Sequence, residues 1–199
     1  MTKKYNVIYA DPPWHYNGGI RSSRKDENGN YLYYTPDTTI GASYQTQGNN
    51  WIKGLPVSQI TNSDCILFLW TTDSHIPEAL EVMKAWGFTY KTIGFIWNKK
   101  ERSGKQVCYY GKWTMKGSEI CLLGTKGIIH SYIASHKVRQ LVEAPRDKTI
   151  HSGKPNEVRD RIVQLMGDLS RIELFARQKT EGWDVWGNEV ESNIELEVI

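Results

Sequence analysis

Cysteine is scarce in this sequence, and no two cysteines lie close together. Cys65, Cys108 and Cys121 form neither a CxxC pair nor the ligand spacing of a zinc site. Cys65 and Cys121 lie in apolar runs, as small core residues do. The pattern favours reduced thiols in an intracellular protein that binds no metal.

Long hydrophobic runs are also missing. The longest, CILFLW at residues 65–70, is far too short to cross a membrane. No long apolar stretch follows MTKK at the start, so we predict no signal peptide. We therefore expect a cytoplasmic protein without a membrane partner.

Neither sign of charge dominates the chain. The formal net charge is +3, which is compatible with nucleic-acid binding without arguing for it. Hydrophobic residues make up 39% of the 199 positions, which is typical of a globular protein, and we predict a single domain over residues 1–199. Eight tryptophans and eleven tyrosines are the stronger hint, because aromatic faces can hold bases, although most will serve core packing.

Strand-like and helix-like segments alternate along the chain. Apolar spacing and flanking Pro and Gly predict helices over 76–86 and 155–166. Short apolar runs predict strands at 5–10, 65–70, 90–99, 119–127, 139–145, 171–176 and 183–190. This alternation predicts an α/β sandwich around a mostly parallel sheet. Two long loops, 17–50 and 98–117, follow strand ends, where loops usually carry function.

The tetrapeptide DPPW at residues 11–14 directly follows the first strand. Two prolines cannot extend a strand, because each lacks a backbone N–H and has a fixed φ. Asp11 is therefore left at the carboxyl end of a strand, the edge of an open α/β sheet where ligands bind. An ordinary turn would use the same residue types, so the rest of the chain must decide.

Six motifs in order resemble one family: ADPPW at 10–14, SYQT at 43–46, EICLLG at 119–124, HSGKP at 151–155, IELFAR at 172–177 and GWDVWGNE at 182–189. They are similar to the DPPW-type N6-adenine methyltransferases, which include the catalytic subunit of the eukaryotic mRNA adenosine methyltransferase and many bacterial and phage DNA enzymes. The resemblance implies a Rossmann-like class I methyltransferase sandwich with permuted motif order, the DPPW strand coming first.

The resemblance assigns the chemistry to Asp11, Pro12, Pro13 and Trp14. The exocyclic N6 of adenine is a poor nucleophile, since its lone pair is delocalised into the ring. Asp11 and the Pro12 carbonyl would accept hydrogen bonds from the two N6 hydrogens and favour a pyramidal nitrogen. Trp14 would stack on the base, and alignment of the reacting atoms would supply most of the rate.

The resemblance also implies S-adenosylmethionine as cofactor. Its candidate contacts are Asp11, Arg146, His151, Ser152, Lys154, Phe175, Arg177, Asn188 and Glu189. Asn188 and Glu189 would hold the ribose. One position departs from the family: eukaryotic catalytic members have Lys directly before the Glu of the E–CL–G strand, and here Ser118 stands there, with Lys116 two residues earlier.

The implied substrate is nucleic acid. Its candidate contacts are Trp14, Tyr44, Lys99, Lys100, Arg102 and Lys105. The small size favours the bacterial and phage branch, hence DNA, with RNA as the alternative. Two further readings are a non-catalytic nucleic-acid-binding subunit and a cytosine-N4 enzyme; the intact DPPW argues against both. Because the family's counterpart of 98–117 lies at a subunit interface, we expect a homodimer.

Overall fold

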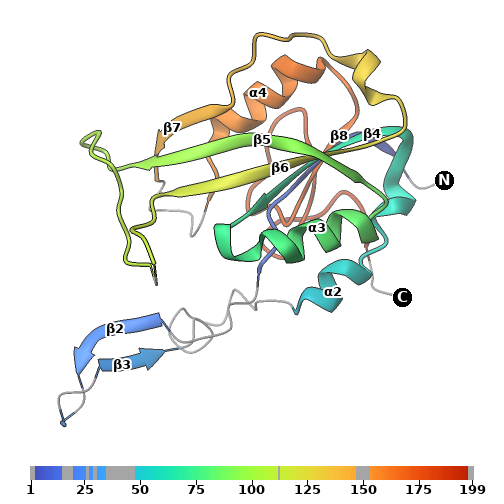
Figure 1. Ribbon diagram of the computed structural model, residues 1–199. Helices are drawn as coiled ribbons and strands as arrows, with labels where there is room; N and C mark the ends of the chain where they lie inside the picture. The colour runs from blue at the N-terminus through green and yellow to red at the C-terminus, as the bar shows by residue number, and fades with distance from the viewer. Residues whose placement is uncertain are drawn as a thin grey trace.

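Seven strands form one sheet at the centre of the molecule. The computed structural model describes residues 3–14, 20–25, 27–28, 31–34, 48–111, 113–146 and 153–196. The sheet order is β7-β5-β6-β4-β1-β8-β9 (Figure 1). The strands are β1 (Tyr5–Ala10), β4 (Thr61–Thr71), β5 (Thr89–Lys100), β6 (Ser118–Lys126), β7 (Leu141–Pro145), β8 (Arg171–Leu174) and β9 (Asp184–Trp186). Each of them overlaps a predicted strand.

The first strand lies in the middle of the sheet. β1 pairs in parallel with β4 on one side and with β8 on the other. β9 continues the parallel arrangement beyond β8, and β7 is parallel to β5. β6 runs antiparallel to both of its neighbours, β4 and β5. The predicted mostly parallel α/β sheet is confirmed, and the carboxyl ends of β1, β4, β8 and β9 share one edge with the amino end of β6.

Helices cover both faces of the sheet, which gives a three-layer sandwich (Figure 1). The alternating side chains of β1 define the two layers, because successive residues of a strand point to opposite faces. Tyr5, Ile8 and Ala10 pack with buried residues of α2 (Asn49–Gly54) and α3 (Ile76–Ala85). Val7 and Tyr9 pack with α4 (Asn156–Met166). A strand covered on both faces is apolar along nearly its whole length, and in this strand Asn6 is the one polar residue.

The helix boundaries follow the predicted signals. Pro77 lies in the first turn of α3, and Gly87 follows its end with a φ of 85°. α4 begins directly after Pro155 and ends at Gly167, whose φ is 72°. The left-handed backbone at the carboxyl end of each helix favours glycine. One face position differs from the expected spacing: Leu80 is 37% exposed, whereas Val82 is buried.

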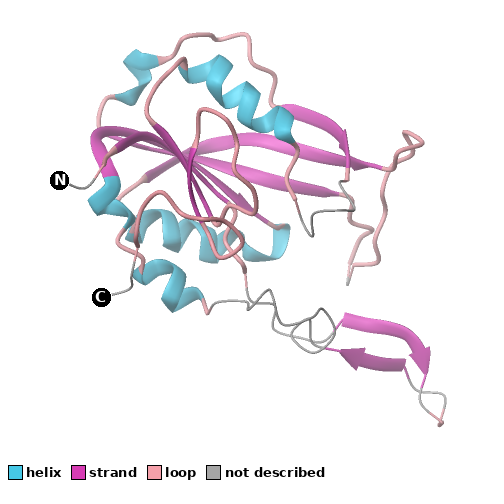
Figure 2. Cartoon of the chain, turned by 180° about the vertical axis from the view of Figure 1, so that it is seen from behind, coloured by secondary structure: helices cyan, strands magenta, loops and turns pink. Residues whose placement is uncertain are grey.

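Both predicted loops contain regular structure. In 17–50, β2 (Ile20–Lys25) and β3 (Tyr31–Tyr34) form an antiparallel pair, and α2 begins at Asn49. This pair stands apart from the seven-stranded sheet (Figure 2). In 98–117, β5 extends to Lys100, and isolated bridges join Lys100 to Gln106 and Tyr109 to Lys116. Three short 3-10 helices complete the described elements: η1 (Val57–Ile60), η2 (Asp73–His75) and η3 (Ile129–Tyr132).

The cysteines lie as the sequence suggested. Cys65 and Cys121 are buried, Cys108 is exposed, and all three are free thiols. Within the described ranges, no three His, Cys, Asp or Glu side chains gather as a metal ion would require, and no helix has the length and apolarity needed to span a membrane.

Candidate active site

The DPPW segment forms a tight turn at the carboxyl end of β1. The Asp11 amide still bonds to the Leu174 carbonyl of β8, at 3.4 Å. The Trp14 amide then donates to the Pro12 carbonyl over 2.9 Å, closing a three-residue turn around Pro13. The fixed φ of proline suits that turn. Both prolines are buried, so the backbone beside Asp11 is held rigidly.

The Trp14 side chain is enclosed in the protein. Only 5% of its surface is exposed, and its indole N–H donates to the Trp70 carbonyl over 3.0 Å. His75 stacks on the ring, with centroids 6.0 Å apart and planes 25° from parallel. Nδ1 of His75 lies 2.9 Å from Oγ1 of Thr72. In this arrangement Trp14 anchors the DPPW turn to the end of β4, a role that the sequence alone did not suggest.

Asp11 is the first of four charged side chains that are linked in a row, with acids and bases alternating. Lys154 Nζ donates to Asp11 Oδ2 over 2.6 Å and lies 3.2 Å from Glu119 Oε2. Glu119 also accepts from Lys99. The side chain of Lys154 is only 4% exposed, and those of Asp11, Glu119 and Lys99 are 17%, 13% and 15% exposed. The cluster is therefore shielded from water, where charge–charge interactions are strong.

The pKa values of Lys154 and Glu119 favour the charged form of each group. Burial alone would lower the pKa of Lys154, but the carboxylates of Asp11 and Glu119 outweigh burial and raise it. Burial alone would raise the pKa of Glu119, yet Lys154 and Lys99 outweigh it and lower that pKa. Lys154 thus remains an ammonium and Glu119 a carboxylate at neutral pH.

A cavity of about 240 Å³ opens next to Asp11 and Lys154. Its wall continues over Glu173 and Phe175 of the β8 end and over Arg177. The described residues that line it are Asp11, Ala144, Pro145, Gly153, Lys154, Pro155, Asn156, Glu157, Arg159, Glu173, Phe175, Arg177 and Gln178. Acids and bases alternate along this lining, so the cavity suits a ligand that carries both signs of charge.

A buried ion pair closes the floor of the cavity. Arg159 of α4 donates from Nε to Glu173 Oε2 over 2.7 Å and from Nη2 to Oε1 over 2.6 Å. Arg159 and Glu173 are 6% and 5% exposed. The guanidinium also lies over the ring of Tyr9, 5.4 Å from its centroid. Such a two-point pair holds planar groups in one orientation, and it ties α4 to the carboxyl end of β8.

Phe175 has an unusual backbone where β8 ends. Its φ is 62°, and it is the one residue other than glycine with positive φ in the described part of the chain. A bulky residue in this region is strained, and such strain gathers at ligand sites. Two ring contacts hold it: Trp186 at 5.4 Å and Trp51 of α2 at 6.4 Å between centroids. The chain turns at Phe175 and continues along the cavity wall to Arg177.

The structure brings together some of the predicted cofactor residues. Asp11, Lys154, Phe175 and Arg177, which come from three separate motifs, line one cavity. Three others do not line it: Arg146, Asn188 and Glu189. His151, Ser152 and Tyr44 lie outside the described residues.

The three predicted cofactor residues that do not line the cavity, Arg146, Asn188 and Glu189, have different surroundings. Arg146 Nη2 lies 2.9 Å from Glu101 Oε1, and its guanidinium lies over Tyr109, 5.2 Å from the ring centroid. Asn188 and Glu189 are exposed, just past the end of β9. They therefore lie at the strand edge that ligands use in α/β folds.

The basic residues of 98–117 divide into two groups. Lys99 is the last member of the charge chain and pairs with Glu119, and Lys100 pairs with Glu143 at 2.9 Å. Both are therefore engaged within the protein. Arg102 and Lys105 are exposed. The two groups differ because Lys99 and Lys100 are the last two residues of strand β5, whereas Arg102 and Lys105 come after its end.

Two site residues were missed by motif reasoning. Glu119 was quoted in EICLLG without a role, and His75 was not considered. The signal for Glu119 is a charge placed directly before an apolar strand, at the edge where the neighbouring parallel strands end. Because β6 is antiparallel, its amino end meets the carboxyl end of β4, with Ile120 opposite Thr71. That pairing cannot be read from the sequence.

Comparisons with known proteins identify the family of the chain. The family model described as MT-A70 matches residues 5–189. The chain is similar to the type II methyltransferase M.MunI of Mycoplasma sp, with 38% identity over 194 residues, covering 96% of this chain and 80% of that protein. It is also similar to the N6-methyladenosine RNA methyltransferase MTA1 of Pyricularia oryzae, 27% identical over 94% of this chain and 47% of that protein. The N(6)-adenine-specific methyltransferase METTL4 of Homo sapiens is 26% identical over 94% of this chain and 38% of its own length.

Proposed function

The chain belongs to the MT-A70 family, and from this premise we propose that it transfers a methyl group from S-adenosylmethionine to N6 of adenine in DNA. The observation that carries the proposal is the Asp11 carboxylate, held by Lys154 at the end of β1 and facing a cavity of mixed charge. Two of the relatives are an N6-methyladenosine RNA methyltransferase and an N(6)-adenine-specific methyltransferase. The similarity to a type II methyltransferase, which covers most of both chains, favours DNA.

The residues of the cavity fit the proposed cofactor. Its ammonium and sulfonium groups need acceptors or negative charge, and Asp11 and Glu173 line the cavity. Its carboxylate needs donors, which Lys154 and Arg177 supply. Phe175 offers an apolar surface, and the exposed Asn188 and Glu189 at the end of β9 are in reach of an extended ligand as ribose acceptors. When bound, the cofactor supplies an electrophilic methyl group.

Asp11 and the DPPW turn then prepare the nucleophile. The carboxylate and the Pro12 carbonyl would accept hydrogen bonds from the two N6 hydrogens. The Pro12 oxygen already accepts one bond from the Trp14 amide, and a carbonyl has a second lone pair for another. A nitrogen held in this way directs its lone pair at the methyl carbon. With the cofactor bound, transfer would form the C–N bond and break the C–S bond, and Asp11 would take the released N6 proton and pass it to solvent.

Lys154 has a further part in this scheme. It holds the Asp11 carboxylate in one orientation and stays paired with Glu119 while that carboxylate accepts from the amino group. Glu119 therefore keeps the ammonium in place without a large rearrangement. Preorganised charge of this kind favours the transition state, because little reorganisation remains when the reaction occurs.

The test is a labelling experiment on DNA and RNA. The chain is incubated with methyl-labelled S-adenosylmethionine and either substrate, and the nucleosides are separated by mass spectrometry. We expect N6-methyladenine from DNA, no turnover by Asp11→Ala, and normal turnover by Asp160→Ala, an exposed carboxylate of α4. Label on cytosine, or on protein alone, would refute the proposal. Label on RNA alone would show that the substrate is RNA and not DNA. Light scattering of the same preparation tests the proposed homodimer.

A further inference from the structure

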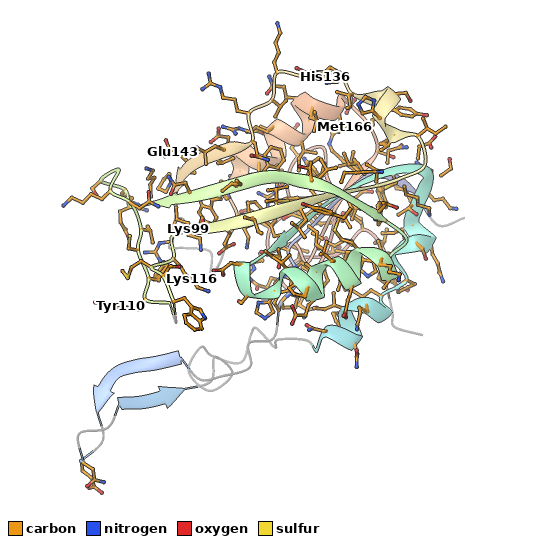
Figure 3. The ribbon with its side chains drawn as sticks, viewed as in Figure 1. Lys99, Tyr110, Lys116, His136, Glu143 and Met166 are labelled. Carbon is orange, nitrogen blue, oxygen red and sulfur yellow. The ribbon has the colours of Figure 1, made fainter. Side chains whose placement is uncertain are left out.

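Two large aromatic side chains project from the segment between β5 and β6. Tyr110 is 95% exposed and Trp113 is 89% exposed. Most other tryptophans of the chain are buried, with Trp70, Trp86 and Trp97 at 2% or less. Figure 3 places Tyr110 at the outer end of the segment, with Lys99 and Lys116 nearer the sheet. Exposed aromatic residues on this scale commonly mark an interaction site.

The base of this segment is well anchored. Tyr109 and Lys116 exchange two backbone hydrogen bonds, of 2.7 and 2.8 Å. Lys116 Nζ lies 2.9 Å from Asp73 Oδ1, in the turn after β4. Gly111 leaves no room for a side chain, since a Cβ there would lie 2.3 Å from the Thr114 carbonyl oxygen. The turn that carries the two aromatic side chains is therefore compact.

The anchored base adjoins the proposed catalytic carboxylates. A second hollow of about 180 Å³ is lined by Tyr109, Lys116, Ser118, Lys99 and Glu119, among others. Lys99 and Glu119 lead directly through Lys154 to Asp11. The aromatic tip thus stands next to the edge where the target base would enter.

The charge of the segment selects the partner. Residues 101–117 contain the basic residues Arg102, Lys105, Lys112 and Lys116 and a single acid, Glu101. Basic side chains interleaved with aromatic ones are typical of surfaces that bind nucleic acid, with the cations on phosphates and the rings on bases. A partner protein with an apolar patch would not require this excess of one sign.

We propose that Tyr110 and Trp113 form a wedge that enters the DNA duplex beside the target adenine and stacks on the bases left behind when that adenine is extruded. The proposal deepens the proposed function and rests on it. A base inside a duplex is out of reach of Asp11, so it must leave the stack, and its extrusion costs pairing and stacking energy. Stacking on the two rings offsets part of that cost.

The experiment measures extrusion directly. The recognised sequence is first mapped from N6-methyladenine in plasmid DNA treated with the chain. A duplex with 2-aminopurine in place of the target adenine then reports extrusion by a rise in fluorescence. The variants are the double substitution Tyr110→Ala/Trp113→Ala, the conservative Tyr110→Phe/Trp113→Phe, and the control Tyr132→Ala, a 43% exposed tyrosine in η3.

A wedge predicts a defect that depends on base pairing. The double alanine variant should bind the matched duplex at least about tenfold more weakly and give little fluorescence rise, because each base lost from a stack weakens binding substantially. With a mismatch opposite the target, extrusion is easier, so the defect should shrink to a small factor. The phenylalanine variant should recover most binding, and cofactor affinity and the control variant should match the parent.

Other results would overturn the wedge. An equal defect on matched and mismatched duplexes would make the two rings a plain DNA contact. Unchanged DNA affinity, together with a changed molecular mass in sedimentation, would make them an interface between two copies of the chain. A parent that gives no fluorescence rise on any duplex would exclude extrusion. Failure of methyl transfer to DNA would be seen first, in the labelling and mapping steps, and would refute the proposed function. A parent that methylates DNA, with a double alanine variant that binds the matched duplex and raises its fluorescence as the parent does, would refute the wedge alone.

Discussion

The ammonium group of Lys154 donates to the carboxylate of Asp11 over 2.6 Å, although the two residues are 143 positions apart in the chain. The same ammonium lies 3.2 Å from Glu119. One buried cation thus orients the proposed catalytic acid and links it to a second carboxylate. The proposed chemistry at Asp11 depends on this link, and it can be tested residue by residue.

Replacing Lys154 by Met should lower turnover by about 10²-fold, the usual effect of losing one preorganised charged donor. In that variant burial raises the pKa of Glu119 and only Lys99 opposes it, so more of this carboxyl is protonated as the pH falls. The ratio of variant to parent turnover should therefore decrease from about pH 9 to about pH 6. Lys84→Met, at an exposed position of α3, is the control. A ratio that stays constant with pH would contradict the coupling.

Two adjacent lysines should differ sharply in their effect on stability. Lys99 pairs with the buried Glu119, whereas Lys100 pairs with Glu143, whose side chain is 53% exposed. We expect Lys99→Met to lower the free energy of unfolding by about 2–3 kcal/mol, since a buried carboxylate loses a partner. Lys100→Met should change it by about 0.5 kcal/mol or less. Urea unfolding at neutral pH measures both free energies. Equal losses of stability would argue against a shielded Lys99–Glu119 pair.

The same pair predicts how that difference varies with pH. The folded-state pKa of Glu119 lies below its ordinary value. Its stabilising contribution is therefore complete above the ordinary glutamate pKa and is lost as the pH falls through the lowered value. The stability difference between the parent and Lys99→Met should be full at neutral pH and should shrink as the pH falls below the ordinary pKa of glutamate. Urea titrations across this range check the sign, and a difference that grows in acid would contradict it.

Gly187 should not tolerate a side chain. A Cβ at this position would lie 2.2 Å from the Ala176 carbonyl oxygen, which belongs to the backbone of the cavity wall. We expect Gly187→Ala to lower the free energy of unfolding by about 2 kcal/mol or more, because backbone has to move, and to weaken cofactor binding. Gly48→Ala is the matched control, since nothing lies within 4 Å of its Cβ. Thermal melts and calorimetry with S-adenosylmethionine would detect both effects, and similar results for the two variants would refute the prediction.

One of the three thiols should react in the folded protein. Burial raises the pKa of Cys65 to about 12 and also raises that of Cys121, whereas Cys108 is exposed. Since the thiolate is the reactive form, a disulfide reagent should label Cys108 quickly and the other two only after unfolding. Cys108→Ser should abolish the fast phase. A second fast thiol in that variant would show that the core opens readily.

Local features of the fold could be predicted from the sequence because they depend on neighbouring residues. Pro77 and Gly87 bound α3, and Pro155 and Gly167 bound α4, since proline and glycine restrict or permit particular backbone angles wherever they occur. The end of β1 at Asp11 follows from the two prolines in the same way. Regular structure inside 17–50 and 98–117 was not predicted, because these stretches lack the apolar periodicity that indicates strands and helices.

The site itself has two origins. The sequence determined which residue types are present and at which strand ends they lie: Asp11 after β1, Phe175 after β8 and Lys154 before α4. Only the tertiary structure decided which of them meet. The antiparallel β6 brings Glu119 to Lys154, the turn of 101–117 exposes Tyr110 and Trp113, and the packing of β4 and α3 encloses Trp14. These contacts depend on strand order and on distant packing surfaces, which no local pattern of residues encodes.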